Sequence, residues 1–175
     1  MKSLISDFKC SKNEDLQEFL LNSSIRMEEA DKTRTYLVLD EENIYNENEN
    51  FRILGYFSLA TKSIQISGKV AKSKVREFDG INKNAENIDC YLIGQLGKNE
   101  IYKDIINGKI ILDSAIDIIE TVKSFIGRRV ILVESVDDEK VIQFYIDNGF
   151  TKIEEIEIIT KDDKIEKLHQ LIRRI

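Results

Sequence analysis

The chain has 175 residues, of which 42% are hydrophobic and 33% are charged, and its formal net charge is −6. This composition is typical of a globular protein rather than a disordered one, and we predict a single domain over residues 1–175. No apolar run reaches the roughly 20 residues that span a bilayer, and Ser6, Asp7 and Lys9 interrupt the N-terminus where a signal peptide would be apolar. We therefore expect a cytoplasmic protein with no membrane partner.

The charge balance and the sulfur-containing residues narrow the possible chemistry. An acidic chain disfavours nucleic acid as a partner and mildly favours a small cation such as an amine. Cys10 and Cys90 lack the spacing of a metal site, so we predict two buried thiols that serve as small hydrophobic side chains. The one histidine, His169, lies in a charged terminal segment, and we expect it to be incidental. No metal cofactor is predicted.

The N-terminal part of the sequence predicts a helix followed by a strand. Residues 13–30 place apolar side chains at helical spacing, and Asn13 or Ser11 can cap the helix. Residues 33–40 are rich in β-branched and aromatic side chains, which favour a strand. The polar residues 41–50 then predict a hairpin loop, so the next strand is expected to be antiparallel.

Residues 51–66 predict that next strand, or two strands, with a possible bulge at Gly55. Residues 67–87 show little periodicity, and we interpret them as a solvated loop. A loop that contacts a phosphate of substrate or cofactor is the alternative, because four cations lie in it: Lys69, Lys72, Lys74 and Arg76.

The next elements alternate between strand and helix. Residues 89–96 predict a strand, residues 97–107 a loop, and residues from Gly108 onward a helix that ends at Gly127. Residues 130–133 form a continuous apolar run, which is typical of a strand buried on both faces. A strand, a helix and a strand with short links predict a right-handed crossover and a parallel pair.

The C-terminal elements are a helix and at least one strand. Residues 138–148 predict a helix capped by Asp137 or Asp138 and stopped at Asn148-Gly149, and residues 151–160 predict a strand. The last segment fits either a helix or the return strand of a hairpin turned at residues 161–163.

The order of these elements and their motifs resemble the GNAT superfamily of acyl-CoA-dependent N-acetyltransferases, including bacterial members. The resemblance is sharpest in YLIGQLGKN, GKIILDSAIDIIE, RRVILVES and DEKVIQFYIDNGF, and the last resembles the family ending FY-x-x-x-GF. The N-terminal DFKCSKNEDLQEFL resembles the opening of toxin-like members. The resemblance implies an α+β (α/β) fold with a mixed, mostly antiparallel central sheet, one splayed parallel strand pair and helices on both faces. It also favours a strand at the C-terminus.

The resemblance implies a site for acetyl-CoA or coenzyme A. Where the strands at residues 90–96 and 130–133 splay apart, free main-chain groups would pair with the pantetheine arm, and the following helix N-terminus would bind the pyrophosphate. Ile106 stands where the family has a glycine, so either its side chain crowds the phosphates or the loop has a different shape, and the charges of nearby lysines would compensate. The cofactor-binding candidates are Ile93, Gln95, Leu96, Lys98, Lys103, Asn107, Gly108 and Lys109. The family often has an asparagine where this chain has Asp138, to which we assign only a capping role.

Acetyl transfer needs a neutral amine, a polarised thioester carbonyl and a protonated leaving thiolate. Tyr145 matches the family tyrosine, and a phenol with a pKa of ~10 is protonated at pH 7, so Tyr145 is the predicted general acid. Only about one alkyl amine in 2,000 to 3,000 is neutral at pH 7, so a base is needed. Glu134 is a weak candidate, with Glu100 or a water molecule as alternatives.

Three functions follow from the sequence. The first is an acetyl-CoA-dependent N-acetyltransferase acting on an amine of a small molecule, a peptide or a protein. The second is a toxin-type acetyltransferase that modifies aminoacyl-tRNA, which is the one case in which nucleic acid would be a partner. The third is a non-catalytic acyl-CoA-binding module, which the altered cofactor loop favours. The oligomeric state is open, with a homodimer as one alternative.

Overall fold

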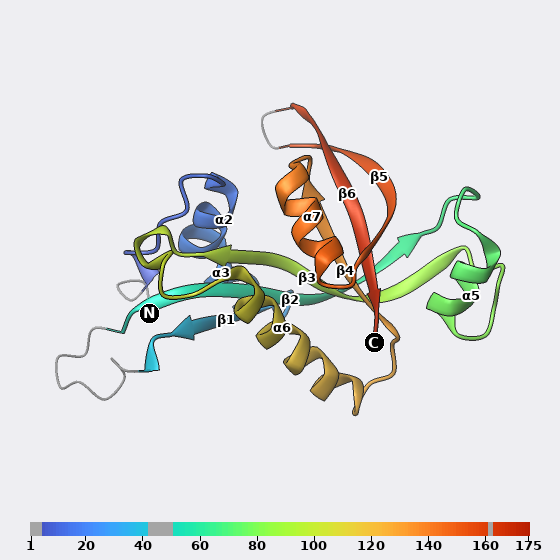
Figure 1. Ribbon diagram of the computed structural model, residues 1–175, viewed down its shortest axis with the longest axis horizontal. Helices are drawn as coiled ribbons and strands as arrows, with labels where there is room; N and C mark the ends of the chain where they lie inside the picture. The colour runs from blue at the N-terminus through green and yellow to red at the C-terminus, as the bar shows by residue number, and fades with distance from the viewer. Residues whose placement is uncertain (1–4, 42–50, 161–162) are drawn as a thin grey trace. The chain divides into compact units, whose positions relative to one another are not determined.

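A computed structural model describes residues 5–41, 51–160 and 163–175. Six strands form one sheet in the order β1-β2-β3-β4-β6-β5 (Figure 1). Contacts within the chain group it into two compact units, which we describe separately. The first unit contains Met1–Ala60 and Ile93–Ile118, and the second contains Thr61–Leu92 and Ile119–Ile175.

The sheet is mixed and mostly antiparallel, with one parallel pair, as predicted. Antiparallel pairing joins β1 to β2, β4 to β6 and β5 to β6, and the C-terminal segment is a strand rather than a helix. The strands are β1 (Arg34–Leu39), β2 (Ile53–Gln65), β3 (Asn87–Lys98), β4 (Val130–Val136), β5 (Thr151–Ile159) and β6 (Ile165–Arg174). The helices are α2 (Glu14–Glu18), a π-helical turn (Phe19–Ser23), α3 (Ser24–Glu29), α5 (Lys72–Asp79), a 3₁₀ turn (Glu100–Tyr102), α6 (Gly108–Lys123) and α7 (Glu139–Asp147).

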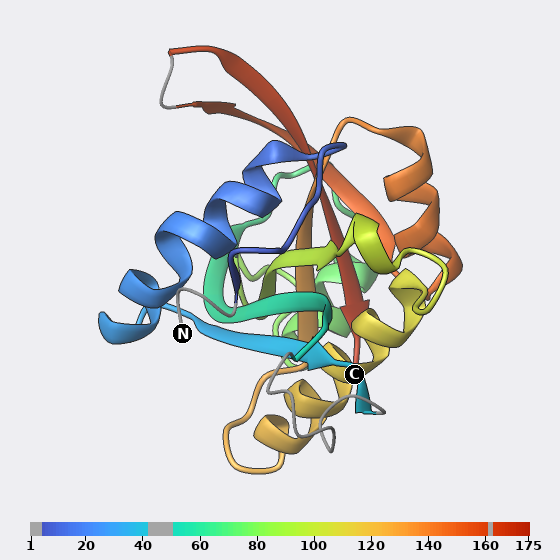
Figure 2. The ribbon, with the colours of Figure 1, turned by 90° about the vertical axis from the view of Figure 1, so that its left-hand side faces the viewer.

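Neighbouring residues of β2 point to opposite faces of the sheet, so this strand can contact a helix on each face. In the first unit, helices pack on both faces. Tyr56 points toward the N-terminal helix, where its ring contacts Phe8 edge to face and its hydroxyl donates to the Leu16 carbonyl at 2.6 Å. A Cβ atom at Gly55 would collide with Ile111 of α6, so this glycine lets the helix approach the strand closely. Asn13 caps the N-terminal helix as predicted, and α2, the π turn and α3 form one continuous helix (Figure 2).

The second unit is built on β4, the β5–β6 hairpin and the adjoining parts of β2 and β3. Val130 and Leu132 of β4 pack with Ile64, Ile172 and Phe78 in one core cluster, and Phe78 brings helix α5 into that cluster. Helix α7 packs against β4 and β5. The β5–β6 hairpin appears as a long twisted ribbon in Figure 2.

Three local predictions differ from the structure: the loop at residues 67–87, the end of the helix that begins at Gly108, and the position of the β-bulge. The segment 67–87 is not all loop, because α5 buries Val75 and Phe78 at helical spacing and ends at Gly80, whose φ of 97° suits a glycine. Helix α6 ends at Lys123 rather than at Gly127.

The β-bulge was expected at Gly55, and in the structure it lies at the preceding residue. Val38 pairs with Gly55 and Leu39 with Ile53, which leaves Leu54 as the extra residue. Most of the predicted hairpin loop (residues 42–50) and most of the predicted turn (residues 161–162) lie outside the described residues.

Candidate active site

The predicted cofactor-binding residues all lie in one continuous stretch of the first unit. β3 supplies Ile93, Gln95 and Leu96 and ends at Lys98, where the buried Asn99 anchors the chain. The Asn99 amide donates to the Ile53 carbonyl at 2.9 Å, and its side-chain oxygen accepts from the Ile101 amide at 3.1 Å. The end of the strand is therefore fixed to β2. The splay of β3 from β4 stays a prediction, because the C-terminal half of β3 and all of β4 belong to different units.

The loop before α6 is compatible with a phosphate group at the helix N-terminus. The side chain of Ile106 is buried, which favours the alternative of a loop with a different shape over a side chain that crowds the phosphates. Asn107 caps the helix, since its oxygen accepts from the Ile110 amide at 3.1 Å. The first amides of α6, those of Gly108 and Lys109, have no intrahelical partner and are available to an anion.

The lysines around this loop differ in how free their charges are. Lys109 is engaged by Asp113 of the next turn, with N–O distances of 2.6 and 2.8 Å. Lys98 reaches the Lys103 carbonyl at 3.3 Å, which places its ammonium beside the loop. The side chain of Lys103 is exposed and has no ion-pair partner among the described residues. Lys98 and Lys103 are therefore better placed than Lys109 to meet a phosphate.

In the second unit, the QFYIDNGF motif fixes the position of Tyr145. Gly149 has a φ of 84°, and the Phe150 and Gly149 amides donate to the carbonyls of Tyr145 and Ile146, each at 3.0 Å. This hydrogen-bond pair is the Schellman motif, which ends a helix with a glycine in the left-handed region. The rings of Tyr145 and Phe150 meet edge to face at 5.4 Å, and Phe144 packs on Tyr145 at 5.2 Å. The turn and the two phenylalanines together hold the tyrosine ring.

The hydroxyl group of Tyr145 has no hydrogen-bond partner among the described residues. The residue is 8% exposed, and its oxygen is not one of the fully enclosed polar atoms that lack a hydrogen-bond partner. Burial of the ring raises the pKa of Tyr145 to about 12. The phenol is therefore fully protonated at neutral pH and has a free hydrogen to donate.

Glu134, the candidate base, lies in the same unit between Lys62 and Gln170, and we call these three side chains the polar row. The ammonium of Lys62 lies 2.7 Å from each Glu134 oxygen, and the Gln170 amide nitrogen donates to one of them at 2.9 Å. Glu134 is thus an ion-paired carboxylate rather than a free one. The alternative base, Glu100, accepts from the Ser11 hydroxyl and the Lys12 amide, and the Ser11 hydrogen bond is the main cause of its lowered pKa, which makes it a weak base.

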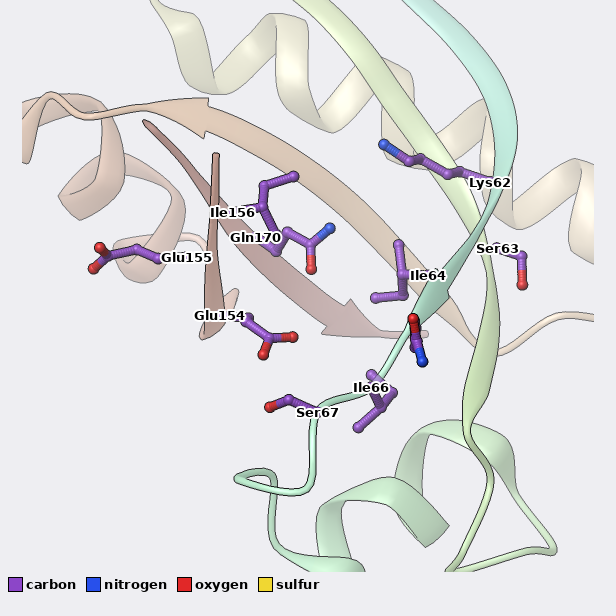
Figure 3. A pocket seen from close by; sticks show the side chains of 10 residues that line it. Lys62, Ser63, Ile64, Ile66, Ser67, Glu154, Glu155, Ile156 and Gln170 are labelled. Atoms are coloured by element: carbon purple, nitrogen blue, oxygen red, sulfur yellow. The ribbon is translucent and has the colours of Figure 1, made fainter. Parts of the chain in front are cut away.

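The polar row leads into an open pocket of about 510 Å³ between the end of β2 and the β5–β6 hairpin (Figure 3). Its wall is aliphatic at Ile64, Ile66 and Ile156. Glu154 extends toward Ser67 in Figure 3, and no described residue pairs with its carboxylate.

The buried Gln170 lines the same pocket with its amide oxygen, which has no hydrogen-bond donor among the described residues. A carboxylate and an amide oxygen above an aliphatic wall suit a primary amine with an apolar body. This pocket was not predicted from the sequence. The available signal was the presence of Lys62 and Gln170 within otherwise apolar strands.

The structure confirms the prediction for the cysteines and shows the surroundings of His169. His169 is 3% exposed, and its Nε2 lies 2.7 Å from an Asp137 carboxylate oxygen, so it is a buried, hydrogen-bonded residue. Both cysteines are free and buried, and burial raises the pKa of each thiol, to about 12 for Cys90. In the described part of the chain, no group of three metal-ligating side chains occurs and no helix is long and apolar enough to cross a membrane.

Comparison with known proteins places this geometry in a fold. No protein-family model and no curated protein matches the chain. Among solved structures, AtaT complexed with acetyl-methionyl-tRNAfMet superposes with a TM-score of 0.68 at 18% identity, over 93% of this chain and 85% of that one. The chain has the GNAT fold.

Two more structures with the GNAT fold resemble the chain. AtaTR bound with AcCoA has a TM-score of 0.63 at 19% identity, over 94% of this chain and 86% of that one. A tyrosine-to-phenylalanine mutant of KacT has a TM-score of 0.64 at 17% identity, with the same two coverages of 94% and 86%. At these identities the likeness establishes the fold.

Proposed function

We propose that this GNAT-fold protein is an acetyl-CoA-dependent N-acetyltransferase that transfers the acetyl group directly from the thioester to an amine. The observation that carries the proposal is Tyr145, a buried phenol whose hydroxyl has no described partner and whose ring is fixed by the Schellman turn. The proposal is supported by AtaTR, a complex of the same fold that was crystallised with AcCoA.

The first unit offers a fitting site for the cofactor, which supplies the acetyl thioester when bound. The amides of Gly108 and Lys109 and the charges of Lys98 and Lys103 would hold its phosphates. Main-chain groups of Ile93, Gln95 and Leu96 would pair with the pantetheine arm, and a free main-chain amide there would polarise the thioester carbonyl.

The pKa of Tyr145 refines the role of its hydroxyl. Full proton transfer from a phenol with a pKa of about 12 to a thiolate whose thiol pKa is ~8.5 would be uphill by about 5 kcal/mol. Tyr145 therefore acts as a hydrogen-bond donor that stabilises the developing thiolate. As the nitrogen–carbon bond forms and the carbon–sulfur bond breaks, the attacking nitrogen gives its proton to water, and the departing thiolate takes a proton from water.

The amine must lose its first proton before it attacks. Because Lys62 occupies both oxygens of Glu134, we assign Glu134 to holding Lys62 and Gln170 in place, and we assign the proton to a water molecule. Glu154 and the Gln170 oxygen would bind the incoming amine in the pocket of the second unit. Glu134 as the base remains the alternative, in which case Glu134→Gln would abolish the rise of kcat with pH.

The acceptor has a second, more specific candidate in the α-amino group of an aminoacyl-tRNA. The observation that favours it is the fold shared with AtaT, whose complex contains acetyl-methionyl-tRNAfMet. An aliphatic pocket with an unpaired carboxylate is compatible with the amino acid end of such a molecule. The acidic net charge of −6 argued against it, but that charge is unevenly distributed, as described below.

The test is calorimetry with acetyl-CoA followed by turnover assays on an amine panel and on aminoacylated tRNA. Micromolar binding with release of the free thiol is expected. No binding at millimolar acetyl-CoA would refute the cofactor assignment. Binding without turnover on every acceptor, unchanged in Tyr145→Phe, would instead identify a non-catalytic acyl-CoA-binding module.

A further inference from the structure

The connection between β2 and β3 concentrates positive charge on an acidic protein. Residues 67–84, which we call the basic segment, carry five cations and two carboxylates, a net charge of +3 that leaves −9 for the rest of the chain. Its cations, all of them exposed, are Lys69, Lys72, Lys74, Arg76 and Lys83. The segment is also structured, because Val75 and Phe78 anchor α5 in the core of the second unit.

The carboxylates of the basic segment are already engaged. Glu77 pairs with Lys74 at 2.9 Å, and Asp79 accepts from the Ile81 and Asn82 amides just after α5, with the Asn82 bond as the main cause of its lowered pKa. The other four cations, Lys69, Lys72, Arg76 and Lys83, have no ion-pair partner among the described residues. Four unpaired cations on an anchored helix and its flanking turns form a positively charged surface that attracts a phosphate backbone.

The position of the basic segment beside the pocket indicates which polyanion it would take. Ile66 and Ser67 line the pocket, and the basic segment begins at Ser67 (Figure 3). Ile64 of the pocket wall and Phe78 of α5 pack in the same core cluster. A molecule that has its amine in the pocket and leaves it past Ser67 would place the adjoining part of its chain beside these cations.

We propose that the basic segment binds the phosphate backbone of an RNA whose aminoacyl end enters the pocket. The inference rests on the proposed function for the identity of the ligand, because an amine attached to a polyphosphate chain is the chemistry of an aminoacyl-RNA. The phosphate contacts orient the RNA, and the pocket selects its amino group.

The test measures binding of an aminoacylated tRNA by fluorescence anisotropy, in the absence of acetyl-CoA so that no turnover occurs. If four cations contact phosphates, the logarithm of the association constant falls with the logarithm of salt concentration with a slope of about −3. This slope corresponds to about 60-fold weaker binding at 200 mM than at 50 mM salt. Lys72→Gln/Arg76→Gln should weaken binding at least about sevenfold and change the slope to about −1.5.

The matched control is Lys123→Gln/Lys164→Gln, which removes the same charge from exposed positions of the same unit. The control should bind within about twofold of the parent protein. Equal losses in both double variants, or an unchanged salt slope in Lys72→Gln/Arg76→Gln, would overturn the proposal, as would stronger binding of a DNA duplex than of tRNA. If Lys72→Gln/Arg76→Gln unfolds, Lys69→Gln/Lys83→Gln tests the same surface in the turns outside α5.

Failure of this inference can be distinguished from failure of the proposed function. If tRNA binding depends on the basic segment but the wild-type protein acetylates no amine, the proposed function is wrong and the RNA surface stands. If small amines are acetylated while tRNA binding does not depend on the basic segment, only the RNA surface is wrong.

Discussion

Replacing Tyr145 by phenylalanine removes one oxygen atom and leaves the packing of the ring in place. The edge-to-face contacts with Phe144 and Phe150 do not involve the hydroxyl, and no described residue hydrogen-bonds it. We therefore expect the free energy of unfolding of Tyr145→Phe to stay within about 0.5 kcal/mol of the wild-type value. Any loss of activity can then be assigned to the hydroxyl group.

The size of the loss follows from the role that the pKa permits. A residue that fully transfers a proton would account for about 10²- to 10⁴-fold in rate. A phenol with a pKa of about 12 remains protonated and contributes one hydrogen bond to a charged sulfur, which is worth about 1.5–3 kcal/mol. We therefore expect kcat to fall between about 10- and 150-fold, with KM for acetyl-CoA unchanged.

The assay follows release of the free thiol from acetyl-CoA between pH 6 and pH 10.5. Tyr145 is protonated throughout this range because its pKa is raised, so the wild-type rate should show no decline near the ordinary tyrosine pKa of ~10. Tyr36→Phe, which removes a hydroxyl from β1, should keep wild-type kcat. Wild-type turnover by Tyr145→Phe at every pH would refute the reasoning, and so would an increase in KM with no change in kcat.

Two further predictions concern the turn and the buried histidine. Gly149→Ala should lower the free energy of unfolding by about 1–2 kcal/mol and reduce kcat, because a Cβ atom disfavours a φ of 84° although it has ordinary space near Arg173. Gly149→Asn should lose less in both measurements, since asparagine tolerates this conformation better, and equal losses would contradict the backbone argument. The hydrogen bond with His169 is the main cause of the lowered pKa of Asp137 in the folded protein. The ionised carboxylate therefore stabilises the fold above its unfolded pKa of ~3.9, and this stabilisation is lost as the pH falls through the lower folded pKa. In urea denaturation, Asp137→Asn should therefore be less stable than the wild type at pH 6, and this difference should shrink below pH 4; a constant difference would argue against the linkage.

Much of the fold could be predicted from local pattern. The apolar run at residues 130–133, the helical spacing after Gly108 and the Asn148-Gly149 stop each depend on neighbours in sequence, and β4, α6 and the end of α7 lie where they indicate. Helix α5 was missed because only Val75 and Phe78 mark its buried face among many charges. A short amphipathic helix has too few apolar positions to stand out before its packing partner is known.

Part of the candidate site could likewise be predicted from local sequence, and the rest depended on the tertiary structure. The sequence by itself determined that Tyr145 precedes a glycine-stopped helix end, because the motif FYIDNGF carries the turn chemistry within its own residues. Only the tertiary structure decided that Lys62 pairs with Glu134, that His169 is buried beside Asp137, and that Glu154 and Gln170 line a pocket. The two residues of each pair are at least 16 positions apart in sequence, and a side chain's partner across a sheet is set by strand order and register.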